Sequence, residues 1–431
     1  MKSKGGDKTN VKWDRLDNTA HLFPVIANES MSSVYRISVT LSEEVDKELL
    51  QEALNRVLPF FDIFNSRMRK GFFWYYFETN TKEAPVVMEE NTYPCLYIPM
   101  YANRNYLFRV TYYNRRINLE VFHVLTDGMG GITFLRELVY QYLRLKYPLL
   151  QEKLGDGLCS ATSLNKEDSY LKNYRKSSKR QYKTEKAFHL KGELFPSPGL
   201  GVMHGYMSVE DVKKAAKCRG MSINQYLVGV MTYAIYTQAM HSLPNKRPIA
   251  TCVPVNLRPY FDSNTTKNFF AVVTAVLHAE KEDMSFEEVM EIVKESLAQQ
   301  ITKENLEKVI AYNVSNEKKY ILRLVPLFIK NMAIKGIYHT SANANTTTVT
   351  NLGEIEILDD YRPYIKQMHI VLSMTKGQNL KSTVCTYQGK MTFTISSKLK
   401  DNSVQRAFFT KLVEEGIDVS IETNGVYYEE V

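Results

Sequence analysis

Phe122-His123-Val124-Leu125-Thr126-Asp127-Gly128-Met129-Gly130-Gly131 is the stretch from which the fold and function of this chain are inferred. It follows the apolar run 117–122, which is typical of a strand, and precedes apolar residues at helical spacing over 132–143. A polar turn held between a strand and a helix is a common place for functional residues. Histidine accepts a proton near neutral pH, so His123 is a candidate general base. No GxSxG pattern and no neighbouring cysteine accompany it, which argues against a nucleophile triad.

A histidine followed four residues later by Asp-Gly resembles the HxxxDG signature of the acyltransferases related to chloramphenicol acetyltransferase and to condensation domains. The resemblance implies that His123 removes a proton from an alcohol or amine as it attacks a thioester. It also implies that Asp127 points away from the histidine and pairs with an arginine, and that Gly128 is structural. The family's paired histidines are Phe122-His123 here, so only the second, catalytic one is present. The C-terminal DFGWG motif of the plant branch is absent.

A second block, Val253-Pro254-Val255-Asn256-Leu257-Arg258-Pro259 with Asn268-Phe269-Phe270-Ala271-Val272, is similar to the family's P-V-(N/D)-x-R and G-N blocks. Arg258 matches the arginine that pairs with the aspartate of the turn. Asn268 matches a residue that a strand of the second lobe brings to the substrate channel. Lys267 replaces the family's glycine, which leaves the role of Asn268 open. The alternative for this block alone is an ordinary strand end that carries an arginine.

The third block, Val349-Thr350-Asn351-Leu352-Gly353, resembles the (S/T)-N-x-G segment of the alcohol acetyltransferase branch. The resemblance makes Thr350, Asn351 and Gly353 candidates for lining the substrate channel. Thr350 or Asn351 could donate a hydrogen bond to the oxyanion of a tetrahedral intermediate. The alternative is a turn between two strands.

A chain of 431 residues exceeds the size at which a single core stops growing, so two lobes are expected. We predict an N-terminal lobe over 1–170, a crossover linker over 171–200 and a C-terminal lobe over 201–431. The resemblance implies an α/β fold of two chloramphenicol-acetyltransferase-like lobes, which form a V-shaped pseudo-dimer with a tunnel at their interface. The linker carries a basic run, for which a solvated surface or a phosphate-binding patch are the alternatives: Lys172, Arg175, Lys176, Lys179, Arg180, Lys183 and Lys186.

Local patterns predict the elements of both lobes. Strands are expected at 35–41, within 60–77, and at 107–113, 117–122, 202–207, 249–257, 269–278, 346–350, 367–374, 381–387 and 391–397. Ser42 is expected to cap a helix that ends before Pro59, and Ser208, Ser222 and Ser285 to open three others. A final helix is expected from Asn402. The helical region 305–335 contains an apolar stripe, for which lobe packing and a membrane surface are the alternatives.

Bulk properties restrict the classes of partner. The net charge of +8 favours anionic partners, but no nucleic-acid-binding pattern is present. Five cysteines without a CxxC pair argue against disulfides and zinc and favour a reducing cytoplasm. The N-terminus MKSKGGDKTN has no apolar signal region, and no apolar run is long enough to span a membrane.

Together these features predict an acyltransferase that moves an acyl group from acyl-CoA, as co-substrate, to an alcohol or amine. No permanently bound cofactor or metal is expected, and the protein is expected to be a monomer. Two alternatives stay open. One is a condensation enzyme whose acyl donor is attached to an acidic carrier protein. The other is a non-catalytic family member that binds a ligand or partner.

Overall fold

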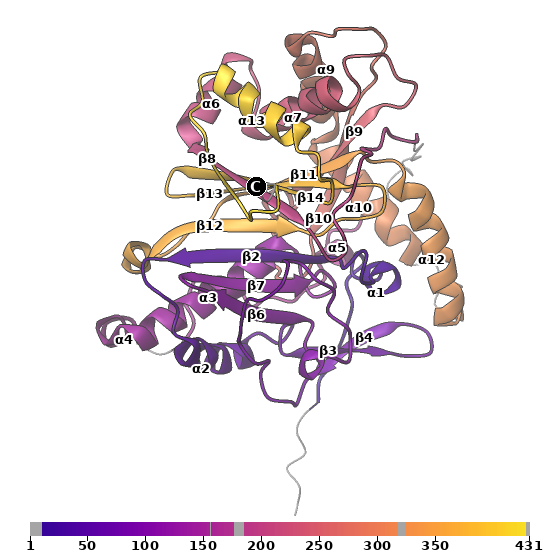
Figure 1. The fold of residues 1–431 in the computed structure, drawn as a ribbon. Coiled ribbons are helices and arrows are strands. Elements are labelled where there is room, and N and C mark those ends of the chain that lie inside the picture. Colours follow the sequence, from indigo (N-terminus) through magenta and orange to yellow (C-terminus); the bar gives the residue numbers. More distant parts are fainter. Residues whose placement is uncertain (1–10, 156, 176–184, 318–323, 428–431) are drawn as a thin grey trace, which may run out of the picture.

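The computed structural model describes residues 11–155, 157–175, 185–317 and 324–427. Its elements form two layered lobes, one built mainly from the first part of the chain and one from the second (Figure 1). The basic run of the linker falls mostly outside the described residues, because Lys176, Lys179, Arg180 and Lys183 belong to 176–184.

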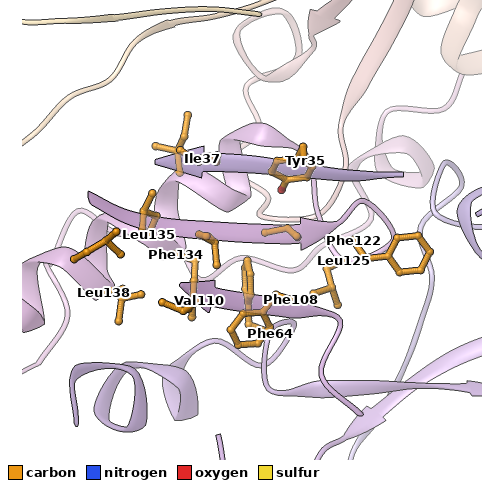
Figure 2. Close-up of a cluster of buried hydrophobic side chains, with 14 of the residues drawn as sticks. Tyr35, Ile37, Phe64, Phe108, Val110, Phe122, Leu125, Phe134, Leu135 and Leu138 are labelled. Carbon is orange, nitrogen blue, oxygen red and sulfur yellow. The ribbon is translucent and has the colours of Figure 1, made fainter. Parts of the chain in front are cut away.

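The first lobe is built on a five-stranded sheet in the order β12-β2-β7-β6-β5. Its strands are β2 (Val34–Leu41), β5 (Met88–Glu89), β6 (Phe108–Tyr113), β7 (Arg116–Phe122) and β12 (Ile365–Leu372). The sheet and helix α3 (Gly128–Lys146) enclose an aromatic cluster in which Phe64 stacks on Phe134 with ring centroids 4.0 Å apart (Figure 2). Helix α2 (Lys47–Val57) packs on α3 and buries Leu50 and Leu54. Burial of these side chains is the main driving force for this lobe.

A smaller sheet lies beside the first lobe in the order β1-β4-β3. It consists of β1 (Trp13–Arg15), β3 (Ser66–Lys70) and β4 (Tyr75–Thr79). The short helix α1 (Phe23–Ile26) follows β1 and is opened by Pro24. This arrangement carries the segment 14–26 from the small sheet toward the interface of the lobes.

The second lobe is built on a seven-stranded sheet in the order β10-β9-β11-β13-β14-β8-β15. Helices cover its outer side (Figure 1), where α7 packs against both α9 and α13. The strands are β8 (Gly201–Ser208), β9 (Ile249–Asn256), β10 (Phe270–Leu277), β11 (Thr347–Glu354), β13 (Leu380–Tyr387), β14 (Lys390–Ser397) and β15 (Ser420–Thr423). The helices are α6 (Val209–Cys218), α7 (Ile223–Ala239), α9 (Phe286–Gln300) and α13 (Ser403–Glu414).

The remaining elements connect these layers. They are α4 (Pro148–Leu154), α5 (Ser169–Lys172), α8 (Arg258–Phe261), α10 (Lys303–Glu317) and α12 (Leu327–Ala342), with 3₁₀ turns η1 (Leu58–Phe60), η2 (Asn103–Asn105) and η3 (Asp359–Tyr364). Helix α12 stands on the flank of the molecule (Figure 1) and buries Leu327 and Ala342 while Met332 and Ile337 stay exposed. No helix in the described part of the chain combines the length and the apolar character needed to cross a membrane.

Strand β12 does not follow the lobe boundaries expected from the sequence. It lies within 201–431, yet it pairs antiparallel with β2 and completes the sheet of the first lobe. Its other side meets the second lobe, where the Thr383 hydroxyl donates to the Ile370 carbonyl at 2.6 Å and the Ser396 hydroxyl to that of Leu372 at 2.9 Å. The boundaries 1–170 and 201–431 therefore need this correction: one strand of the second segment is part of the first lobe.

Two histidines face each other where the sheets meet. The rings of His204 on β8 and His369 on β12 have centroids 4.4 Å apart. The Tyr206 hydroxyl donates to Glu422 at 2.7 Å, so it accepts at 2.8 Å from Nε2–H of His369. Burial lowers the pKa of both histidines, to about 3 for His369, with Arg116 and Lys390 adding to the effect on that residue. Both rings are therefore neutral at physiological pH.

Most predicted elements are present with shifts of a few residues at their ends. The capping boxes at Ser222 and Ser285 are confirmed, and Ser208 caps α6 by accepting from the Asp211 amide. The prediction for Ser42 is wrong. Asp46 caps α2 instead, because its carboxylate accepts from the Leu49 amide at 2.9 Å, while the Ser42 amide bonds to the Tyr364 carbonyl.

Candidate active site

His123 directly follows β7, where the hairpin of β6 and β7 delivers the chain to the lobe interface. Its amide donates to the Ser33 carbonyl at 3.0 Å, which extends the pairing of β7 with the chain before β2. Phe122, at the position of the first histidine in the motif that this stretch resembles, is buried with 3% of its surface exposed (Figure 2). This position therefore serves the core of the first lobe rather than the polar site.

Three aromatic rings surround the imidazole of His123. Phe23 stacks on it with centroids 4.7 Å apart, and Tyr35 meets it edge-on at 5.1 Å. Phe270 of the second lobe lies at 5.9 Å. The imidazole is thus held between both lobes, while part of its surface remains accessible.

The tautomer of His123 is set by Asn268. The Asn268 Nδ2 group donates to an Asp17 carboxylate oxygen at 2.8 Å and to the His123 carbonyl at 3.4 Å. This fixes the orientation of the amide, so its Oδ1 faces Nδ1 of His123 at 3.1 Å. An amide oxygen only accepts hydrogen bonds, so Nδ1 carries the proton and Nε2 has a free lone pair. In this arrangement the Nε2 atom of His123 is the one that can accept a proton.

Asp17 anchors the chain of hydrogen bonds behind the imidazole. It accepts from both the backbone and the side-chain amide of Asn268, at 3.3 and 2.8 Å, and from the Ala20 amide at 2.8 Å. Burial raises the pKa of Asp17 to about 7, although the hydrogen bonds from Asn268 and Ala20 act in the opposite direction. Asp17 therefore orients the amide that in turn orients His123.

The surroundings of His123 favour the neutral imidazole. Burial lowers its pKa, and the charge of Lys381 adds to this effect, whereas Asp127 and the hydrogen bond to Asn268 oppose it. The side chain is consequently deprotonated at neutral pH. This is the state that a general base requires before reaction.

Asp127 lies at the N-terminus of α3 and forms a bidentate ion pair with Arg258. The Arg258 Nη1 and Nη2 atoms are 2.8 and 3.0 Å from its two carboxylate oxygens. Oδ1 also accepts from the Gly130 amide at 3.2 Å, and Oδ2 accepts from the Phe269 amide at 2.9 Å. Asp127 therefore caps the helix and connects the turn to the second lobe. Both of its carboxylate oxygens accept the hydrogen bonds that make these contacts.

Arg258 extends the same connection. Its Nε and Nη2 atoms donate to the carbonyls of Thr265 and Lys267 at 2.9 and 2.8 Å. The guanidinium thus holds the loop that leads to Asn268 against the turn that carries His123. The two blocks that the sequence analysis singled out meet at this point.

Glycine is required where the chain crosses the turn. A Cβ atom on Gly130 would lie 1.9 Å from the Thr126 hydroxyl and 2.4 Å from the Thr266 carbonyl, which leaves no room for a side chain. On Gly128 it would lie 2.7 Å from the side chain of Leu352. Strand β11 therefore packs against the start of α3.

The candidates on β11 lie beside this contact. Asn351 uses its side-chain oxygen to accept from the Gly353 amide at 2.8 Å, and Gly353 has a φ of +73° that favours glycine. Residues 350–353 lie within β11, so they do not form the turn between two strands that was the alternative; the pairing of β11 with β13 instead shifts register between Asn351 and Glu354. The bond leaves the Asn351 amide nitrogen as the available donor. Thr350, one residue before Asn351 on β11, is partly buried.

No sequence motif marks Asp17, Phe23 or Tyr35 as site residues. Asp17-Asn18-Thr19-Ala20 has the pattern of an Asx turn, which is a local signal but gives no indication of proximity to His123. Lys267, which departs from the family pattern, pairs with Asp14 at 2.9 Å and donates to the Arg15 carbonyl at 3.2 Å. It thereby fixes the N-terminal segment that carries Asp17. No cluster of potential metal ligands occurs among the described residues.

The chain shares its fold with solved acyltransferases and condensation domains. TRI3 trichothecene 15-O-acetyltransferase from Fusarium sporotrichioides superposes with a TM-score of 0.62 and 12% identity, covering 96% of each chain. F. graminearum TRI101 complexed with coenzyme A and deoxynivalenol gives 0.61 and 10%, covering 95% of this chain and 99% of that chain. The first condensation domain of the calcium-dependent antibiotic synthetase, in complex with a substrate analogue, gives 0.61 and 13%, covering 94% and 96%.

The two-lobe condensation and acetyltransferase fold is the fold of this protein. The predicted fold class is thereby confirmed over nearly the whole chain. At these identities the similarity establishes the fold alone. No protein-family model and no curated protein matches the sequence.

Proposed function

We propose that this protein is an acyltransferase that uses His123 as general base to move an acyl group from a thioester, most directly acyl-CoA, to an alcohol or amine. The observation that carries the proposal is the fixed tautomer of His123, with Nδ1–H held by Asn268 and Nε2 unprotonated. The fold supports the choice of reaction, since TRI101 with this fold is complexed with coenzyme A.

In the proposed reaction, Nε2 of His123 takes the proton of the acceptor hydroxyl or amine as its oxygen or nitrogen attacks the thioester carbonyl carbon. The carbonyl electron pair moves to oxygen and forms a tetrahedral oxyanion. The imidazolium produced is stabilised through Nδ1–H by Asn268, whose amide is bonded to Asp17. When the oxyanion collapses, the carbon–sulfur bond breaks, and Nε2–H returns the proton to the leaving thiolate. The reaction needs no covalent enzyme intermediate.

Asp127, Gly128 and Arg258 have structural roles in this proposal. The ion pair between Asp127 and Arg258 positions the turn, and Gly128 gives β11 access to it. Thr350 and the amide of Asn351 are the proposed donors to the oxyanion, and Gly353 shapes their turn. We further propose that the donor and acceptor reach His123 through a tunnel between the lobes, and that no resident cofactor takes part.

A panel of acyl-CoA thioesters, with thiol release measured for wild type and His123→Ala, tests this function. General base catalysis contributes about 10²–10⁴-fold, so the variant should lose at least about a hundredfold in kcat/KM. Equal rates in both proteins would refute the mechanism.

The donor is tested separately. In the alternative function, the acyl donor is bound to a carrier protein instead of coenzyme A. The fold shared with the condensation domain suggests this alternative. Turnover only with an acylated carrier protein would favour this alternative. Binding of ligands without turnover by any donor would favour the non-catalytic alternative, against which the fixed tautomer of the partly exposed His123 is the structural argument.

A further inference from the structure

Lys381 lies on the face of the second-lobe sheet that turns toward the first lobe. It is on β13, two residues before Thr383 and four before Cys385. The Thr383 hydroxyl and the Cys385 thiol both contact carbonyls of β12, those of Ile370 and Met368. Residues at this spacing on a strand share one face, so Lys381 also faces the interface that contains His123.

The side chain of Lys381 is largely buried without a counter-ion. The residue is 8% exposed, and within the described part of the chain it forms no ion pair and no side-chain hydrogen bond. The titratable groups that act on it are the thiols of Cys252 and Cys95, which are neutral because burial raises their pKa, and the amine of Lys398. Lysine is almost never fully buried unless it is paired, so this amine lacks the partner that would normally accompany it.

The carboxylates on the facing side of the first lobe are already used. Glu120, next to Cys95, pairs with Arg36 at 2.8 Å and also with Arg109, while Glu90 pairs with Arg36 and, at 3.0 Å, with Arg116. Lys398 is itself a cation, and its amine donates to the Ser30 carbonyl at 2.7 Å, so it does not neutralise the charge of Lys381. The protein thus presents a positive group to the interface and leaves it uncompensated.

Backbone and ring contacts connect Lys381 to the candidate base. The Ser396 hydroxyl bonds to the carbonyls of both Lys381 and Leu372, and Leu372 lies opposite Tyr35, whose ring meets that of His123 at 5.1 Å. The charge of Lys381 lowers the pKa of His123, and burial lowers the pKa of Lys381 itself to about 8. An isolated ammonium in a buried position is costly, and an anion that arrives with a ligand removes that cost. The site is therefore suited to a ligand that carries a negative charge near the reacting atoms.

We propose that Lys381 is a specificity residue that binds a carboxylate of the substrate beside His123. The inference rests on the proposed function and adds a substrate class to it. The carboxylate has two possible sources: the distal end of a dicarboxylic acyl group, or a hydroxy acid acceptor. The phosphates of coenzyme A fit less well, because the pantetheine arm separates them from the thioester.

Binding to wild type, Lys381→Met and Lys400→Met is measured by calorimetry with two matched pairs of probes. Succinyl-CoA and butyryl-CoA have acyl groups of equal carbon count and differ by the carboxylate. The pair 3-hydroxybutanoate and its methyl ester tests the acceptor in the same way. Lys400 is the control. It is an exposed lysine that follows the neighbouring strand β14, and its amine pairs with Glu193.

We expect wild type to bind the anionic member of one pair about tenfold to a hundredfold more tightly than the neutral member, the range for a hydrogen bond to a charged group. Lys381→Met should lose this preference and Lys400→Met should retain it. The pair that shows the preference identifies the source of the carboxylate. Absence of a preference in wild type, or its persistence in Lys381→Met, would overturn the inference.

Stability provides a second readout. Because Met keeps the apolar stem and removes an unpaired buried charge, Lys381→Met should unfold at the same or a higher urea concentration than wild type. A lower midpoint would mean that the amine holds the lobes together, and would contradict the assignment. Binding is measured without turnover, so a protein that prefers the carboxylate but transfers no acyl group would refute the proposed function and leave this inference standing.

Discussion

Replacing Asp127 by Asn separates a structural role from a catalytic one. Both carboxylate oxygens of Asp127 accept hydrogen bonds: Oδ1 from the Gly130 amide and Arg258, and Oδ2 from Arg258 and the Phe269 amide. In Asp127→Asn, whichever way the amide is turned, its NH₂ group faces donors only. The substitution thus places an N–H donor of the new amide against donors of its neighbours. It also removes the negative charge that compensates Arg258.

The magnitude follows from burial. The side chains of Asp127 and Arg258 are 9% and 11% exposed. Breaking a buried pair by altering one partner costs about 3–5 kcal/mol, since the other charge is left uncompensated. Arg258→Met should cost a similar amount. In the double variant no buried charge is left uncompensated, although the Asn NH₂ group still faces the amide of Gly130 or of Phe269. We therefore expect a coupling free energy of about 2–3 kcal/mol between the two positions.

Equilibrium unfolding in urea, followed by far-ultraviolet circular dichroism and by tryptophan fluorescence, measures the four proteins of this cycle. Stability and acyl transfer should decline together in both single variants, because the turn that carries His123 loses its connection to the second lobe. If Asp127→Asn unfolds at the wild-type urea concentration but loses activity, Asp127 acts on His123 directly and our assignment is wrong. Additive losses in the double variant would also contradict it.

Other positions give independent tests. Gly130→Ala should destabilise the protein by at least about 3 kcal/mol, because its Cβ would lie 2.4 Å from the Thr266 carbonyl. Gly336→Ala, at a helix position with open space, should stabilise the protein by about 0.5–1 kcal/mol. Thermal unfolding compares the two variants. Asn268→Ala should lower kcat/KM about tenfold to a hundredfold with little change in KM, as the hydrogen bond that orients Nδ1 is lost; unchanged kcat would contradict that role. His369 has a folded pKa of about 3 against 6.5 in the unfolded chain, so the unfolded state binds more protons between these values. Stability should therefore fall as pH is lowered from 6.5 toward 3, by up to about 1.4 kcal/mol per pH unit, and His369→Gln should flatten that dependence in urea titrations.

The sequence predicted those features that local patterns determine. Strand alternation and capping boxes located most elements, because periodicity and end signals act within a few residues. At Ser42 the local signal was misleading, since the Ser42 amide bonds to the Tyr364 carbonyl and the helix begins after Asp46. The motif resemblance brought His123 and Arg258 together in one site, which spacing alone does not indicate.

Contacts between distant segments could not be predicted. Asp17 reaches Asn268 across 251 positions of sequence, and Lys267 fixes that segment through Asp14. The transfer of β12 to the first lobe likewise depends on pairing with β2, for which β12 has no distinctive local pattern. These contacts are long-range, and the burial that selects them exists only once both lobes have formed.

The pH dependence of kcat/KM for wild type and His123→Ala, with a donor that supports turnover, tests the central claim most directly. Burial lowers the pKa of His123, and the base must be neutral to act. We predict that the wild-type rate rises with pH through a midpoint below 6.5, the ordinary value for histidine, and is level at neutral pH. The residual rate of His123→Ala should lack this transition. An ascending limb that persists with the same midpoint in His123→Ala would show that another group is the base.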